Sequence, residues 1–210
     1  MIPDSLLDGY RRFRTDRFAV EEARYRELAD GQAPETMVIG CADSRCDPAT
    51  IFAAAPGELF VIRNVAALVP PSQPDAGYHG TSAAIEFAVD VLRVRNIVVM
   101  GHGLCGGVAT SLASRDAPPP GQFIGPWVQL LSPLRDRLIE DRPEATAEEQ
   151  QRSLERYGIL FSLQNLRSFE FVRSAIDDDR LALHGAWFSI AEGTLHWYDP
   201  GSGRFAVVEA

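Results

Sequence analysis

Short apolar runs that alternate with stretches of helical periodicity constrain this fold more than any other feature. From Thr36 onward, each run ends in a glycine or polar turn and is followed by a helical stretch. The runs that predict strands are MVIGCA, ELFVIRN (58–64) and NIVVMGH (96–102). This alternation is typical of βα units, so we expect an α/β fold with a mostly parallel central sheet flanked by helices.

The segments between and after these strands predict helices, one loop and further strands. Apolar periodicity predicts helices near 78–93, from about Cys105, over 127–142 and over 147–177. The segment DAPPPGQFIGP (116–126) predicts a surface loop, because its prolines exclude a regular helix or central strand. The tail, LALHGAWFSI, TLHWYD and RFAVV, predicts strands joined by hairpins at EG and PGSG, and so antiparallel strands at the C-terminal edge.

The first 30 residues predict a helical arm ahead of the first strand. Two helical pieces, with a break near Thr15-Asp16, each carry apolar residues at helical spacing. Such a stripe has to be buried, either on the chain's own sheet or on a neighbouring subunit, and the pattern leaves both open. A chain of 210 residues otherwise fits a single domain over 1–210.

Composition excludes several classes of function. Twenty Lys+Arg against 29 Asp+Glu give a net charge of −9 with no basic block, so we expect no nucleic-acid partner. No stretch approaches the roughly 20 apolar residues of a membrane span, and the N-terminus is too charged for a signal peptide. We therefore expect no membrane association and a cytoplasmic localisation. Three cysteines, an odd number, suit thiols or thiolate ligands in a reducing compartment.

Cys41 and His102 end the first and third predicted strands, so in a parallel sheet they lie at the same edge, where ligand sites form. In GHGLCGG (101–107), His102 and Cys105 flank a glycine turn, and Cys105 opens a helix whose amides favour a thiolate. Two thiolates and one imidazole suit Zn²⁺, with the fourth tetrahedral position left for water. These residues predict a catalytic metal site.

Two other side chains compete for the fourth position. Cys46 would close a structural cage, but Pro48 and the turn after Arg45 are expected to lead the chain away. Asp43 is better placed to reach the ion or its water, and Arg45 can hold its carboxylate. A surface Asp-Arg pair without function is the alternative for those two residues.

Taken together, the motifs resemble those of the β-class carbonic anhydrases over roughly residues 32–188. Their order and spacing carry the resemblance, and the two metal motifs together are specific where either alone is weak. The matching residues are Cys41-Ala42-Asp43-Ser44-Arg45, Pro56-Gly57-Glu58, Arg63-Asn64-Val65 and His102-x-x-Cys105-Gly106-Gly107.

The resemblance implies a zinc enzyme that interconverts CO2 and bicarbonate. By carry-over, Cys41, His102 and Cys105 bind Zn²⁺, while Asp43 and Arg45 form a catalytic dyad that orients a zinc-bound hydroxide. It also implies a homodimer or a multiple of dimers, with the arm on a partner subunit. The residues carried over as the substrate pocket are Gln32, Phe60, Val65, Phe87 and Gly106. Phe87 departs from plant-like members, which commonly have Tyr there.

Three rival functions fit part of the pattern. A regulatory zinc module on the same scaffold would lose the dyad or the pocket, yet Asp43, Arg45 and Gln32 are present. A phosphatase-like cysteine nucleophile needs Arg six residues after Cys41, but position 47 is Asp. A related hydrolase of CS2 or COS would share the metal ligands, and only a substrate assay separates it. The other histidines and the tryptophans are expected to be structural.

Overall fold

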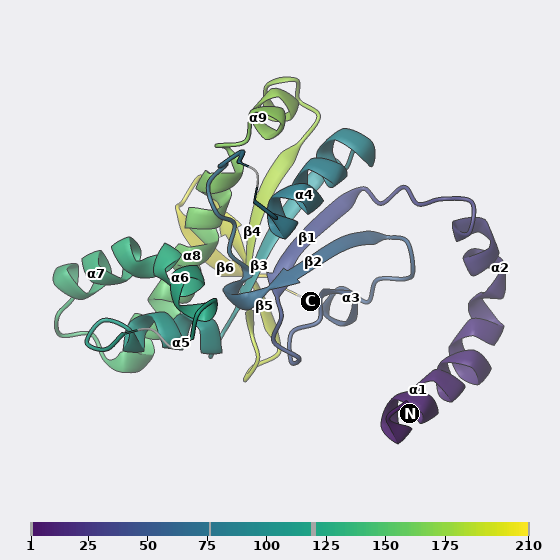
Figure 1. The fold of residues 1–210 in the computed structure, drawn as a ribbon, viewed down its shortest axis with the longest axis horizontal. Helices are drawn as coiled ribbons and strands as arrows, with labels where there is room; N and C mark the ends of the chain where they lie inside the picture. The colour runs from purple at the N-terminus through teal and green to yellow at the C-terminus, as the bar shows by residue number, and fades with distance from the viewer. Residues whose placement is uncertain (1, 76, 119–120, 210) are drawn as a thin grey trace.

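A computed structural model describes residues 2–75, 77–118 and 121–209, and a six-stranded sheet forms its centre (Figure 1). The strand order is β2-β1-β3-β4-β5-β6. The strands are β1 (Thr36–Cys41), β2 (Leu59–Asn64), β3 (Asn96–His102), β4 (Ala182–Ser189), β5 (Thr194–Asp199) and β6 (Arg204–Val207). Strands β2, β1, β3 and β4 are parallel, whereas β5 and β6 are antiparallel. The predicted α/β fold with an antiparallel C-terminal edge is confirmed.

The helices surround this sheet. They are α1 (Asp4–Arg12), α2 (Ala19–Leu28), α3 (Pro48–Ile51), α4 (Gly80–Glu86), α5 (Gly106–Ala113), α6 (Ile124–Val128), α7 (Ser132–Asp141), α8 (Ala147–Leu166) and α9 (Glu170–Asp177). Short π-helical segments are η1 (Phe13–Phe18) and η3 (Phe87–Val91), and 3-10 turns are η2 (Val65–Ala67) and η4 (Gln129–Leu131). Within the described residues, no helix combines the length and apolar character needed to cross a membrane.

Several predicted segments differ in detail from those observed. The helix predicted over 147–177 is two helices, because the Ser168 hydroxyl donates to the Asn165 carbonyl and accepts from the backbone of Ser72, which ends α8. The helix predicted over 127–142 is divided among α6, η4 and α7, and Pro133 lies in the first turn of α7. Of the three tail strands, β4 lies inside the sheet beside β3 rather than at its edge.

The predicted proline-rich loop at 116–126 is shorter than expected, since α6 already begins at Ile124. Its Pro119 and Pro120 lie outside the described residues. The main core forms where α8 and α9 cover one face of the sheet. Met37, Ile39 and Val99 of the strands pack there with Ile159 and Leu166 of α8. This core fixes α8 against β3 and β4.

The N-terminal arm stands apart from the sheet (Figure 1). The break predicted near Thr15-Asp16 is a π-helical segment, η1, so the helix runs on through it. None of its described residues is buried; Val20 is 82% exposed and Leu6 is 65% exposed. Arg24 ties α2 to the neighbouring loop through the Pro56 carbonyl and Glu58. The arm therefore does not bury its apolar residues on its own sheet.

Candidate metal centre

The parallel sheet brings three candidate ligands together at its carboxyl edge. Cys41 is the last residue of β1 and His102 the last of β3, while Cys105 follows a tight turn and caps α5. All three are buried, and their ligand atoms lie within 4.8 Å of one another. The two sulfur atoms are 3.9 Å apart. The predicted ligand set is thus one cluster, drawn from positions 61 and 64 residues distant along the chain.

The cluster fits a tetrahedral zinc ion. Two sulfur ligands at Zn–S distances of about 2.3 Å lie about 3.8 Å apart in a tetrahedron, which matches the observed 3.9 Å. The Nδ1 of His102 donates to the Gly103 carbonyl over 2.8 Å, which leaves the lone pair on Nε2. That Nε2 is buried and has no hydrogen-bond partner in the described chain. A metal ion at this point satisfies an otherwise orphaned acceptor.

The pKa values of the two ligand thiols shift in opposite directions. Hydrogen bonds from Cys105 and Cys46 lower the pKa of Cys41 well below its usual range. The same contact with Cys41, together with burial, raises the pKa of Cys105, while the backbone N–H groups of Gly107 and Val108 oppose this shift. A divalent cation between the sulfur atoms would stabilise both thiolates and so offset the repulsion between their negative charges.

The turn that carries Cys105 has a strained backbone and is held in place by a hydrogen bond to a buried carboxylate. Leu104 has a φ of 57°, a conformation uncommon for a side-chain-bearing residue. The Cys105 N–H donates to the buried carboxylate of Glu155 over 3.0 Å, and the Trp187 indole donates to the same carboxylate over 3.1 Å. Burial raises the pKa of Glu155. Sequence reasoning missed this acid, although its place in the apolar stripe of 147–177 was a signal.

Asp43 and Arg45 form the predicted pair. The Arg45 Nε lies 2.9 Å from Asp43 Oδ1 and its Nη2 lies 2.8 Å from Oδ2, while the Arg45 backbone N–H donates to Oδ1 over 3.0 Å. These hydrogen bonds lower the pKa of Asp43 to about 2. Oδ2 is also 3.9 Å from the His102 Nε2. The carboxylate is therefore ionised, fixed by one arginine and directed toward the metal position.

Cys46 is a buried free thiol beside the cluster. Its sulfur falls within 4.8 Å of a His102 ring nitrogen and an Asp43 carboxylate oxygen. The chain does leave the site at Pro48, where α3 begins, but the Cys46 side chain turns inward and donates to the Asp43 carbonyl over 3.4 Å. The chain thus leaves the site at Pro48 as expected, while Cys46 itself stays beside the cluster as a buried free thiol.

Arg63 and Asn64 organise the loop around the ligands. The Arg63 guanidinium donates to the carbonyls of Cys41 (2.8 Å) and Asp43 (2.5 Å) and pairs with Asp47 at 3.3 Å. Asp47 in turn accepts from the Thr50 N–H and caps α3. The Asn64 amide exchanges two hydrogen bonds with the backbone of Leu68, each 2.9 Å long. These polar residues explain why a loop of irregular backbone holds a fixed shape.

Within one chain, the residues carried over as the substrate pocket fall into two groups. Val65 follows β2 beside the cluster, where a Cβ on Gly107 would lie 2.6 Å from its side chain, and Gly106 follows Cys105. Trp127, expected only to pack, donates its indole N–H to the Val65 carbonyl over 2.8 Å. These residues form the wall next to the metal position.

The second group lies at the other end of the strands. Phe60 pairs with Met37, four residues before the Cys41 pair, which places it roughly 13 Å from that end at about 3.3 Å per residue. Phe87 stacks on Phe60 with ring centroids 5.8 Å apart and is 43% exposed. Gln32 is exposed and precedes β1. One chain alone does not bring these three residues to its own metal position.

The remaining histidines have local partners. His79 pairs with Asp75 at 2.7 Å, and His184 contacts the Asn96 side chain at 3.0 Å. His196 packs edge-on against Trp187, with ring centroids 5.0 Å apart. None of them belongs to the Cys41 cluster.

The fold and the site together define a class of protein. It is an α/β protein with a centre of two thiolates and one imidazole and with an adjoining Asp-Arg pair.

Comparison with known proteins narrows this class to one family. The family model described as carbonic anhydrase matches residues 36–195. Beta carbonic anhydrase 3 of Arabidopsis thaliana is 34% identical over 198 residues, which cover 93% of this chain and 76% of that protein. The chain belongs to the β-carbonic anhydrase family.

Solved structures agree with this assignment. The β-carbonic anhydrase CcaA superposes with a TM-score of 0.90 at 29% identity and covers 98% of both chains. A tetrameric β-carbonic anhydrase of Sordaria macrospora superposes with a TM-score of 0.76 at 32% identity over 92% of both chains. The similarity extends over the arm and the antiparallel edge as well as the core, because the match to CcaA leaves almost none of the chain out.

Proposed function

We propose that this protein catalyses the reversible hydration of CO2 to bicarbonate and a proton, with Zn²⁺ as its metal. The observation that carries the proposal is the Asp43–Arg45 pair directed at the open side of the three-ligand cluster. A regulatory metal module has no need of an ionised carboxylate held there. Membership of the β-carbonic anhydrase family supports the same reaction.

Cys41, His102 and Cys105 would hold the ion and leave a fourth position open to solvent. Zn²⁺ bound there supplies Lewis-acid chemistry that makes a water molecule acidic enough to react near neutral pH. Two thiolates cancel the charge of the ion, since 2 − 2 = 0, so this acidification is weaker than with three neutral histidines. The protein groups around the ion therefore have to contribute more.

Asp43 accepts a hydrogen bond from the reacting water and turns its remaining lone pair toward CO2. Arg45 holds both carboxylate oxygens, so Asp43 stays ionised and cannot rotate freely. Val65 supplies an apolar wall suited to a neutral linear substrate. The proton released on hydration leaves through water to buffer.

The remaining pocket residues favour a second copy of the chain as the supplier of Gln32, Phe60 and Phe87. These residues are remote from the metal position of their own chain, and Phe87 is exposed. The arm also leaves Leu6 and Val20 uncovered, which favours its packing on another subunit. A Gln32 amide from the second copy would then bind the developing bicarbonate oxygen. We infer a homo-oligomer built from dimers, as the tetrameric Sordaria relative also suggests.

Stopped-flow measurement of CO2 hydration by the zinc-loaded protein tests the proposed function. Hydration well above the buffer rate, abolished in a Cys105→Ser variant, supports it. Parallel assays with CS2 and COS separate the alternative hydrolase, since it shares the metal ligands. Turnover of CS2 or COS with no CO2 hydration would replace the proposed reaction.

A further inference from the structure

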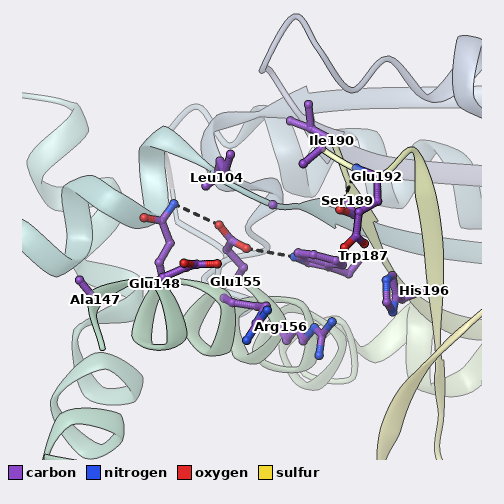
Figure 2. A pocket seen from close by; sticks show the side chains of 14 residues that line it. Leu104, Ala147, Glu148, Glu155, Arg156, Trp187, Ser189, Ile190, Glu192 and His196 are labelled. Atoms are coloured by element: carbon purple, nitrogen blue, oxygen red, sulfur yellow. Dashed lines mark hydrogen bonds between the residues drawn. The ribbon is translucent and has the colours of Figure 1, made fainter. Parts of the chain in front are cut away.

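A cavity of about 470 Å³ lies behind the metal-binding turn (Figure 2). Its walls are the turn at Gly103–Leu104, the first half of α8 and the hairpin between β4 and β5. This volume is in the range of sites for small organic ligands. No metal ligand and neither member of the Asp-Arg pair lines it. It is therefore separate from the reaction site.

Two arginines without carboxylate partners make the cavity suited to an anion. Arg152 and Arg156 lie one turn apart on α8, and neither has a carboxylate within 4.0 Å in the described chain. The Arg156 guanidinium lies 4.6 Å from the centroid of the Trp187 ring. Its Nε is buried without a hydrogen-bond partner. An unsatisfied buried donor of this kind is costly, and an acceptor from a ligand would remove the cost.

Acidic side chains restrict which anion fits. Glu155 is already occupied by donors from Cys105, Gln151 and Trp187, two of which are drawn in Figure 2. Glu148 and Glu192 also line the cavity and would repel a ligand that is negative throughout. A ligand must therefore present an anionic group to the arginines and a hydrogen-bond donor to a glutamate.

Apolar side chains, among them Leu104, Ile190 and Trp187, also line the cavity, next to the polar side chains of Ser189 and His196. Such walls suit a hydrocarbon body, and an inorganic anion would leave most of the volume unfilled. We propose that this cavity is a second ligand site, that it binds a small organic carboxylate carrying a hydroxyl or amino donor at its far end, and that its occupancy alters the metal centre.

The turn between cavity and metal provides the connection. The Leu104 carbonyl accepts from Arg45 over 3.2 Å, and the Gly103 carbonyl accepts from the His102 ring over 2.8 Å. The Cys105 N–H donates to Glu155, whose other partners line the cavity. A ligand that shifts this turn therefore moves atoms bonded to a metal ligand and to Arg45. The coupling is reciprocal, because each site changes the affinity of the other by one factor.

Titration calorimetry with 4-hydroxybenzoate as the probe tests the proposal on the zinc-loaded protein. Saturating azide is present, so that the metal position is blocked. We expect one probe per chain, with affinity weakened about tenfold or more by Arg156→Gln or Arg152→Gln. Arg152 is exposed, so its variant folds even if the loss of Arg156 disturbs packing on Trp187. The matched control, Arg173→Gln on the exposed side of α9, should bind as the wild type does.

Two results would overturn the binding site: no binding of the probe at millimolar concentration in the presence of azide, or binding that both arginine variants retain at the wild-type affinity. For the coupling, azide affinity is measured with and without saturating probe, and a shift of about twofold or more is expected. An unchanged azide affinity would overturn the coupling. The inference rests on a metal at Cys41, His102 and Cys105 but not on CO2 hydration, and binding assays fail independently of an activity assay.

Discussion

At the residue scale, the metal centre combines a buried orphan nitrogen with a carboxylate fixed by one arginine. The Nε2 of His102 has no partner in the described chain, and Asp43 accepts three hydrogen bonds from Arg45. In the proposed function, the nitrogen binds the metal ion and the carboxylate orients the water molecule in the fourth position. These two roles predict different consequences for substitution.

Replacement of Asp43 by Asn should lower CO2 hydration roughly 100-fold, a usual cost for losing a positioned proton acceptor. The amide turns a donor toward Arg45 or toward the water, so orientation is lost while the ligands remain. Stopped-flow rates and bound zinc should be measured together, with exposed Asp90→Asn on η3 as the control. Loss of zinc in parallel with activity would instead make Asp43 a ligand.

The pH dependence of hydration should rise on the alkaline side of neutrality. Asp43, with a pKa of about 2, is ionised throughout that range and cannot cause the rise. The cause is the reacting water, which two thiolates leave less acidic than three histidines would. Rates from mildly acidic to alkaline buffer check this. A profile flat over that range would contradict it.

Sequence reasoning could predict that the three candidate ligands lie together and that Asp43 pairs with Arg45, because each of these residues stands at a strand end or in a short motif. It missed Glu155: an acid within an apolar stripe signals a buried carboxylate, but its partner Cys105 is met only after α8 packs on β3 and β4. It also could not tell that the Cys46 side chain lies beside Asp43 and His102, because that position depends on contacts made in the folded chain. Long-range packing, not local pattern, decides such positions.

At the element scale, helix α8 contributes both to the stability of the fold and to the metal centre, because its Glu155 accepts a hydrogen bond from Cys105. Its N-terminus has a complete capping box: the Thr146 hydroxyl accepts from the Glu149 N–H (3.3 Å), and Glu149 accepts from the Thr146 N–H (2.9 Å). Thr146→Ala should cost about 1 kcal/mol of unfolding free energy. Urea denaturation measures this. A change indistinguishable from zero would mean that tertiary packing alone holds the helix end.

The same box predicts a dependence on acid. The Thr146 N–H lowers the pKa of Glu149 below its ordinary 4.5. Since the folded pKa is the lower one, the stabilisation is complete above 4.5 and is lost as pH falls through the folded pKa. The stability gap between wild type and Glu149→Gln should therefore shrink as pH is lowered through this window. A gap that is constant with pH would exclude the ionised box.

Sequence periodicity predicted where the helices lie better than where they end. Apolar spacing continues across Ser168, so nothing local separates α8 from α9; the hydroxyl ends the first helix through contacts that include Ser72, 96 residues away. The sequence likewise did not predict that β4 pairs in parallel with β3. The hairpin predicts only the antiparallel neighbour β5 and gives no information about the strand on the other edge of β4.

At the scale of the whole molecule, the arm and the divided pocket predict shared active sites. A Gln32→Leu chain and an Asp43→Asn chain should each be poorly active alone. Mixed one to one before assembly, half of the dimers are mixed, and each then holds one intact site. Activity should recover to about a quarter of the wild-type value. A mixture no more active than the mean of the two variants would place the whole pocket within one chain.

The most direct test of the account is a zinc titration of the metal-free protein followed by stopped-flow CO2 hydration at each step. Activity should rise in proportion to bound zinc and stop rising at one ion per chain, since Cys41, His102 and Cys105 form one cluster. Full occupancy at that stoichiometry without hydration above the buffer rate would contradict the central claim that this centre is catalytic.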